Sequence, residues 1–175
     1  ACAAPPAAID GRPLPRFLSL SPESLGRSLS LSKIVTGEYG GKTYRMRYEV
    51  EITPARLAIV GLSPLGVTLF TLIQEQGGSM TVTQPGKNAP FDPRHILFDL
   101  YLTYWPREIL QAALSSLSLR LDQNAAGSVR RVLDANGEPV AEIAYPPQKF
   151  QKGGIVIRHF DIPYRLRIVT LEAVE

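Results

Sequence analysis

The chain has 175 residues, of which 45% are hydrophobic and 20% charged, and this size and composition predict one globular domain with a substantial core. The 19 basic residues barely outnumber the 16 acidic ones and are spread along the chain, which argues against a nucleic-acid-binding protein. No apolar run reaches the roughly 18 residues that a membrane-spanning helix needs.

The N-terminal region contains the single cysteine, Cys2, which has no partner within the chain for a disulfide. Residues 3–16 after it are rich in Ala and Pro and resemble an extended linker. We therefore favour a bacterial lipidation site at Cys2 over an accidental terminal cysteine. Residues 1–27 are predicted to be the lipidation site and tether, and residues 28–175 a single folded domain.

Two long strands are predicted next, over residues 29–39 and 43–52, with Gly40–Gly41 as the turn between them. In the second strand apolar and polar residues alternate, which is typical of a strand with one buried face and one wet face. The apolar positions of this strand are Tyr44, Met46, Tyr48, Val50 and Ile52.

A hairpin over residues 57–73 follows, with Ser63–Gly66 as its turn, because Pro64 presets one turn dihedral and Gly66 tolerates a positive one. Leu65 occupies the tip, where polar residues are usual. Two interpretations stay open for it, since the side chain could fold back onto the sheet or be offered to a membrane or partner. Another short strand is predicted over residues 79–83.

Two helices interrupt the strands. Asp92 and Pro93 are suited to the N-cap and the first position of a helix over residues 93–104, which carries a wide apolar stripe. After Pro106 a second helix is predicted over residues 107–117. Both helices are expected to pack on one face of the sheet.

The remaining chain returns to strands. They are predicted over residues 117–121, 129–133, 139–145, 155–160 and 164–174, with Asn136–Gly137 as a hairpin signal. Successive antiparallel strands with a helical insertion predict a mainly β (α+β) fold. Its centre is a strongly curved sheet or incomplete β-barrel closed by helices.

Catalytic and metal-binding patterns are weak. His95 and His159 fall in different elements without metal-ligand spacing, and no phosphate loop, dinucleotide-binding loop or nucleophile elbow is present in the sequence. Asp99 is expected to face solvent on the back of its helix, with a buried acid as the alternative. The sequence therefore predicts no enzyme, no cofactor and no metal.

The concave side of such a sheet offers a place for apolar ligands, since burying a methylene group contributes about 0.8 kcal/mol. Periodicity alone favours a packed core there, and a hollow beneath the helices is the alternative. The residues predicted to line an apolar cavity are Met46, Tyr48, Val50, Leu69, Ile73, Leu97, Leu100, Tyr101, Tyr104 and Trp105.

Several segments resemble a known family. The hairpin L-S-P-L-G-V-T-L-F-T-L, the helical insertion ending in Y-W, the Asn-Gly hairpin and the final I-R-H-F-D-I-P-Y-R-L-R-I-V-T-L-E are similar to the LolA/LolB-type lipoprotein carriers. The similarity covers about residues 28–174. It is closest to LolB-like lipoproteins, and more narrowly to an uncharacterised family of bacterial lipoproteins that is a domain of unknown function.

The resemblance implies an incomplete barrel of about eleven strands with helices as a lid, a cavity for acyl chains, and a lipid on Cys2. Ala3 is compatible with anchoring to the outer membrane, facing the periplasm. The turn Pro64–Leu65–Gly66 would contact a membrane or partner. The chain departs from LolB-like proteins in lacking their tryptophan near the end and an Asp-Gly-Trp stretch, which leaves the cargo open between lipoprotein and a fatty-acid-like or polyene lipid.

The first functional hypothesis is a non-enzymatic, membrane-anchored carrier of a lipid acyl chain or lipoprotein, monomeric, with a periplasmic carrier protein as a candidate partner. The alternative is a scaffolding envelope lipoprotein with a packed core that docks partners in cell-envelope or polyene-lipid assembly. An enzyme acting on hydrophobic substrates ranks last, because it would need a cluster of titratable groups in the cavity.

Overall fold

The computed structural model describes residues 18–39, 41–85, 92–146, 154–160 and 164–174. Cys2, most of the tether and Gly40 lie outside these ranges, so the predictions made for them remain predictions. Within the described ranges the chain forms ten strands, two α-helices and one short 3-10 helix, η1 (Pro22–Leu25).

The strands form one antiparallel sheet in the order β5-β4-β3-β2-β1-β10-β9-β8-β7-β6, so the last strand joins the first in the middle and β5 and β6 are the free edges. This open, mainly β architecture confirms the predicted fold class. The elements are β1 (Leu29–Tyr39), β2 (Lys42–Ile52), β3 (Arg56–Leu62), β4 (Thr68–Glu75), β5 (Met80–Thr83), α1 (Pro93–Tyr104), α2 (Arg107–Ser115), β6 (Arg120–Gln123), β7 (Val129–Leu133), β8 (Pro139–Ala144), β9 (Ile155–His159) and β10 (Tyr164–Val174).

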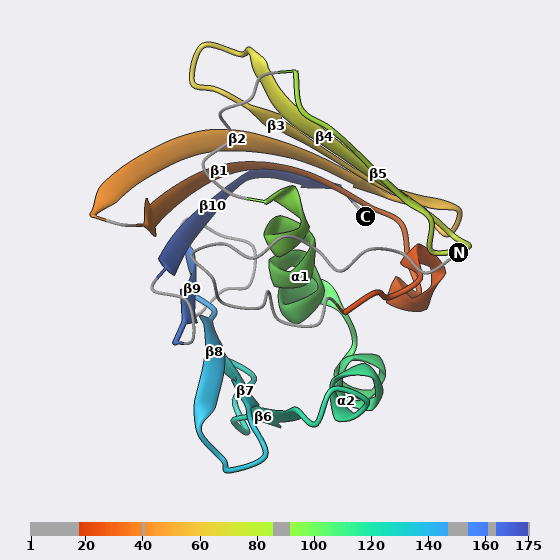
Figure 1. Ribbon diagram of the computed structural model, residues 1–175, viewed down its shortest axis with the longest axis vertical. Helices are drawn as coiled ribbons and strands as arrows, with labels where there is room; N and C mark the ends of the chain where they lie inside the picture. Colours follow the sequence, from red (N-terminus) through yellow and green to blue (C-terminus); the bar gives the residue numbers. More distant parts are fainter. Residues whose placement is uncertain (1–17, 40, 86–91, 147–153, 161–163, 175) are drawn as a thin grey trace.

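The sheet curves around helix α1, with β1 to β5 above the helix, β9 beside it and β6 to β8 below it in the view of Figure 1. Helix α2 packs against β6 at the lower end of the sheet. The sequence predicts one apolar stripe on α1, whereas ten of its twelve residues are buried. A helix that is buried on every side belongs to a core, so α1 fills the concave side of the sheet rather than covering it from one side.

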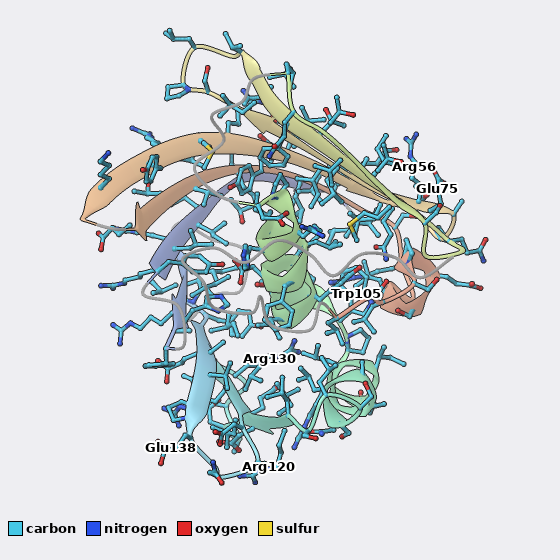
Figure 2. The ribbon with its side chains drawn as sticks, viewed as in Figure 1. Arg56, Glu75, Trp105, Arg120, Arg130 and Glu138 are labelled. Carbon is cyan, nitrogen blue, oxygen red and sulfur yellow. The ribbon has the colours of Figure 1, made fainter. Side chains whose placement is uncertain are left out.

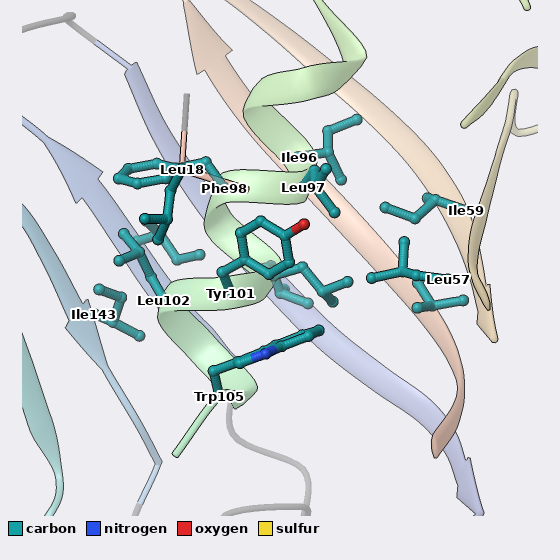
Figure 3. Close-up of a cluster of buried hydrophobic side chains, with 14 of the residues drawn as sticks. Leu18, Leu57, Ile59, Ile96, Leu97, Phe98, Tyr101, Leu102, Trp105 and Ile143 are labelled. Carbon is teal, nitrogen blue, oxygen red and sulfur yellow. The ribbon is translucent and has the colours of Figure 1, made fainter. Parts of the chain in front are cut away.

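The core lies between α1 and the sheet (Figure 3). Leu57 and Ile59 of β3 lie on one side of the helix, and Ile143 of β8 lies on the other. Tyr101 and Trp105 of α1 pack edge to face, with ring centroids 4.7 Å apart. The helix thereby joins two halves of the sheet that are distant in strand order.

The two ends of α1 are held by specific hydrogen bonds. Asp92 accepts a bond from the backbone N–H of Arg94 at 3.0 Å, as predicted for an N-cap residue. At the other end the buried guanidinium of Arg130, on β7, donates to the carbonyls of Leu102 and Trp105 at 3.1 and 2.9 Å (Figure 2). A cation at the carboxyl end of a helix can donate to the last carbonyls, which have no partner within the helix. It also interacts favourably with the negative end of the helix dipole.

The segment before β1 is joined to β4 and to the helix region by polar hydrogen bonds. Tyr101 donates its hydroxyl to Gln74 at 2.6 Å, and Gln74 donates to the carbonyl of Leu20 at 3.0 Å. The indole of Trp105 donates to Ser24 of η1 at 2.8 Å. Burial raises the pKa of Tyr101 to about 12, so its hydroxyl stays a donor at neutral pH.

One predicted boundary is wrong. The sequence predicts a helix over residues 107–117 and a strand over 117–121, but α2 ends at Ser115 and β6 begins at Arg120. Ser115 and Ser116 donate their hydroxyls back to the carbonyls of Gln111 and Ala113. Ser118 then adopts a φ of 59°, which ends the helical turn before the strand can start.

Candidate functional site: the concave interior

On the inward face of β2, three of the residues predicted to line a cavity lie together in the core. Met46, Tyr48 and Val50 are all buried there, and none of them is more than 7% exposed. They pair across the sheet with Val35, Lys33 and Leu31 of β1, which are also buried. The period-two pattern therefore identified the concave face correctly.

Strand β4 presents other residues inward than those predicted. Phe70, Leu72 and Gln74 are fully buried, whereas Leu69 and Ile73 alternate with them and are half-buried. Both faces of this strand are largely apolar in sequence, so alternation alone could not decide which one faces the helix. A cavity-lining role for Leu69 and Ile73 is thus not supported by their position.

Helix α1 contributes the other wall of the interior. Leu97, Leu100, Tyr101 and Trp105 are buried with at most 5% exposure, and Tyr104 is half-buried at the last turn. All five predicted positions on the helix therefore contact the core. The structure brings them together with the inward residues of β2.

A cross-strand row on the concave face ends in a glycine and an aromatic ring. Lys33 pairs with Tyr48, Tyr48 with Gly61, and Gly61 with Phe70. A Cβ atom at Gly61 would lie 2.0 Å from Cε1 of Phe70, so the ring occupies the space that a side chain would need. The Phe70 ring also meets Tyr48 edge to face, with centroids 5.8 Å apart.

The turn between β3 and β4 holds Leu65 in solvent. The Ser63 hydroxyl accepts hydrogen bonds from the N–H groups of Leu65 and Val67 at 3.3 and 3.1 Å, and Gly66 adopts a φ of 80°. Leu65 is 91% exposed and Val67 is 61% exposed. Of the two interpretations of Leu65, folding back onto the sheet is therefore wrong.

A buried lysine in this interior was missed by the sequence analysis. Lys33 lies on the concave face, is 2% exposed, and places its ammonium 4.0 Å from the centre of the Tyr104 ring. Burial lowers its pKa from 10.5 to about 7. The signal in the sequence is the alternation Leu29, Leu31, Lys33, Val35, which places the lysine among inward apolar residues.

A buried polar cluster forms where α1 meets the C-terminal strands. Asp99 is buried, so the solvent-facing prediction for it is wrong and the buried alternative is right. Its carboxylate lies 2.7 Å from Nε2 of His159 and accepts a hydrogen bond from the Tyr164 hydroxyl. The rings of His159 and Tyr164 stack with centroids 4.4 Å apart. No local pattern in the sequence indicated this cluster, because Asp99 lies 60 or more residues before His159 and Tyr164.

In this cluster the histidine and the tyrosine both bond to the same buried carboxylate. Burial lowers the pKa of the nearby His95. Within the described ranges, no group of three His, Cys, Asp or Glu side chains is placed to hold a metal ion.

None of the helices in the described residues is long and apolar enough to cross a membrane. An open antiparallel sheet wrapped around one buried helix defines an incomplete β-barrel as the class of this protein. More narrowly, residues 30–172 match the family described as "Protein of unknown function (DUF3261)". The chain belongs to that family, which confirms the predicted membership of a family of unknown function.

Solved structures with similar folds were also found. One is a domain of a Vibrio parahaemolyticus protein whose name refers to outer membrane lipoprotein sorting, with a TM-score of 0.49, 9% identity and 84% of each chain covered. A LolA superfamily protein from Nitrosomonas europaea has a TM-score of 0.41 and 9% identity, covering 86% of this chain and 89% of its own. A DUF1329 family protein from Desulfovibrio piger has a TM-score of 0.41 and 7% identity, covering 83% and 84%. No curated protein matches the sequence.

Proposed function

We propose that this protein is a non-enzymatic carrier, anchored through Cys2 to the outer membrane and facing the periplasm. It would hold a lipid acyl chain or the acyl chain of a lipoprotein between α1 and the concave sheet, and help to transfer it to the membrane. The observation that carries the proposal is the continuous apolar interior formed by α1 and the inward residues of β2, β3 and β4. An acyl chain would gain about 0.8 kcal/mol for each methylene buried there.

The way in which α1 is attached supports this proposal. The strands bond to one another through backbone ladders, but α1 contacts the sheet through side chains such as Asp99 and Tyr101. The helix could therefore move away from the concave face without breaking a ladder. An acyl chain that replaces the apolar contacts of α1 would offset much of the free-energy cost of moving the helix.

The turn at Leu65 supports a second part of the proposal, the contact with a membrane or donor. The turn carries an exposed leucine and an exposed valine at the end of a projecting hairpin. Contact with a membrane would move their apolar surface out of water and into lipid. Two side chains give a weak, reversible contact, which suits a protein that has to release its cargo. A periplasmic carrier protein is the candidate donor, and the acceptor is the outer membrane.

The proposal is tested by native mass spectrometry of the protein purified from envelope membranes, together with organic extraction. A retained lipid or acylated protein would support a carrier and identify the class of cargo. An apo mass, with no uptake of added fatty acid or lipopeptide, would contradict it.

The alternative function is a scaffolding lipoprotein, and one observation favours it. The side chains between α1 and β3 are buried against one another, as in an ordinary core. A scaffold would bind a partner protein through exposed residues such as Leu65. In that case, Leu65→Glu would remove a partner in a pull-down, and acyl-chain binding would be absent in both the variant and the wild type.

A further inference from the structure

The inference concerns the cation inside the apolar interior. Lys33 is surrounded by Tyr48 on β2, Thr170 on β10 and the ring of Tyr104 on α1. Among the described residues, no carboxylate forms an ion pair with it. Buried charges are costly unless they are paired, so an unpaired ammonium in this place requires a physical reason.

The neighbour of this ammonium has an unused donor. The Tyr104 hydroxyl is buried and makes no hydrogen bond of normal geometry within the described part of the chain. Burial raises its pKa, while the side chain of Thr170 and the charge of Arg27 oppose that rise. A second cation, Arg27, thus acts on the same hydroxyl, and an anion placed there would meet donors from both Lys33 and Tyr104.

The carboxylate of Asp99 is already engaged by other groups. Burial raises the pKa of Tyr48, and the charge of Asp99 raises it further. Asp99 itself accepts bonds from His159 and Tyr164. It is therefore not the counter-ion of Lys33 in this structure.

We propose that Lys33 and Tyr104 bind the carboxylate of a fatty-acid-like ligand within the concave interior. One ammonium and one hydroxyl match a singly charged carboxylate, whereas a phosphate dianion would need further donors. The headgroup approaches from the side of Arg27, which is exposed, and the chain follows the row from Tyr48 to Phe70. The inference rests on the proposed carrier function and adds the class of headgroup to it.

The test compares three ligands with the same twelve-carbon chain length, about the size of one buried acyl chain. Dodecanoic acid, dodecanol and dodecyl phosphate are titrated into the delipidated full chain by calorimetry at about pH 6, where Lys33 is protonated. The wild type is expected to bind dodecanoate about tenfold more tightly than dodecanol. Stronger binding of dodecyl phosphate than of dodecanoate, by about tenfold, would overturn the carboxylate assignment.

Variants locate the headgroup. Lys33→Met keeps the length and apolar stem of the side chain and removes its charge, so it should lose the preference for dodecanoate while binding dodecanol as before. Tyr104→Phe keeps the ring and should weaken dodecanoate several-fold. The matched control is Lys42→Met, at an exposed lysine of β2, which should leave all three affinities unchanged.

The two proposals fail in different ways. If the wild type binds neither dodecanoate nor dodecanol, the carrier function fails and this inference fails with it. If it binds both equally and Lys33→Met changes neither affinity, the carrier function stands and only the headgroup site is overturned. The comparison of the two ligands in the wild type needs no variant, so the result does not depend on how well a variant folds.

Discussion

At the scale of single residues, Lys33 makes the stability of the fold depend on pH above neutrality. Its pKa is about 7 in the folded protein and 10.5 in the unfolded chain, so between these values the unfolded state binds more protons. The free energy of unfolding should therefore rise as the pH is raised from about 7 to about 10, by a few kcal/mol at most.

Lys33→Met should flatten this rise and make the protein more stable at neutral pH, because it removes a buried charge. Denaturant midpoints measured at several pH values for the variant, the wild type and Lys42→Met would check it. An unchanged pH slope in Lys33→Met would contradict the burial of this ammonium.

Gly61 is predicted to tolerate no side chain. Gly61→Ala would place a methyl group 2.0 Å from an atom of the Phe70 ring, so it should lower the free energy of unfolding by about 1–3 kcal/mol or more. Adding Phe70→Leu should recover part of the loss, which a double-mutant cycle by chemical denaturation would measure. Gly77→Ala is the control, since no atom lies within 4 Å of its Cβ position.

At the scale of elements, the anchoring of α1 depends on a residue from a distant strand. Arg130→Met removes the guanidinium bonds to the carbonyls of Leu102 and Trp105 and should cost about 2 kcal/mol or more. The adjacent Arg131 forms an exposed ion pair with Glu142 at 2.8 Å, so Arg131→Met should cost less than about 1 kcal/mol. Thermal unfolding of both variants checks the contrast, and equal losses would contradict the anchoring role.

The limits of sequence-based prediction are clear in the same elements. The inward face of β2 was predictable because Met46, Tyr48 and Val50 alternate with charged residues, whereas β4 is apolar on both faces and gave the wrong set. The cap at Asp92 was local and therefore predictable. The alternation in β1 marks Lys33 as an inward residue, but its contact with Tyr104 depends on a residue far along the chain. Arg130 and the Asp99 cluster likewise depend on distant tertiary neighbours, which no local pattern encodes.

At the scale of the whole molecule, the projecting hairpin and the interior are predicted to do different tasks. Leu65→Glu places a charge on the exposed tip without touching the core, so the fold and acyl-chain affinity should be unchanged. Transfer of a fluorescent fatty acid from the protein to vesicles should slow several-fold. Leu171→Glu, at another exposed leucine, is the control, and equal transfer rates in both variants would argue against a membrane-contacting role of the turn.

The central claim is that the ligand lies inside the curved sheet against α1. Trp105 is the single tryptophan of the chain and is fully buried at the end of this helix, so its fluorescence reports on the interior alone. The decisive measurement is quenching of this fluorescence by brominated fatty acids, because bromine quenches indole only at short range. The account predicts saturable quenching by the brominated fatty acid and none by its unbrominated counterpart. Binding without quenching would place the ligand outside the interior and contradict the account.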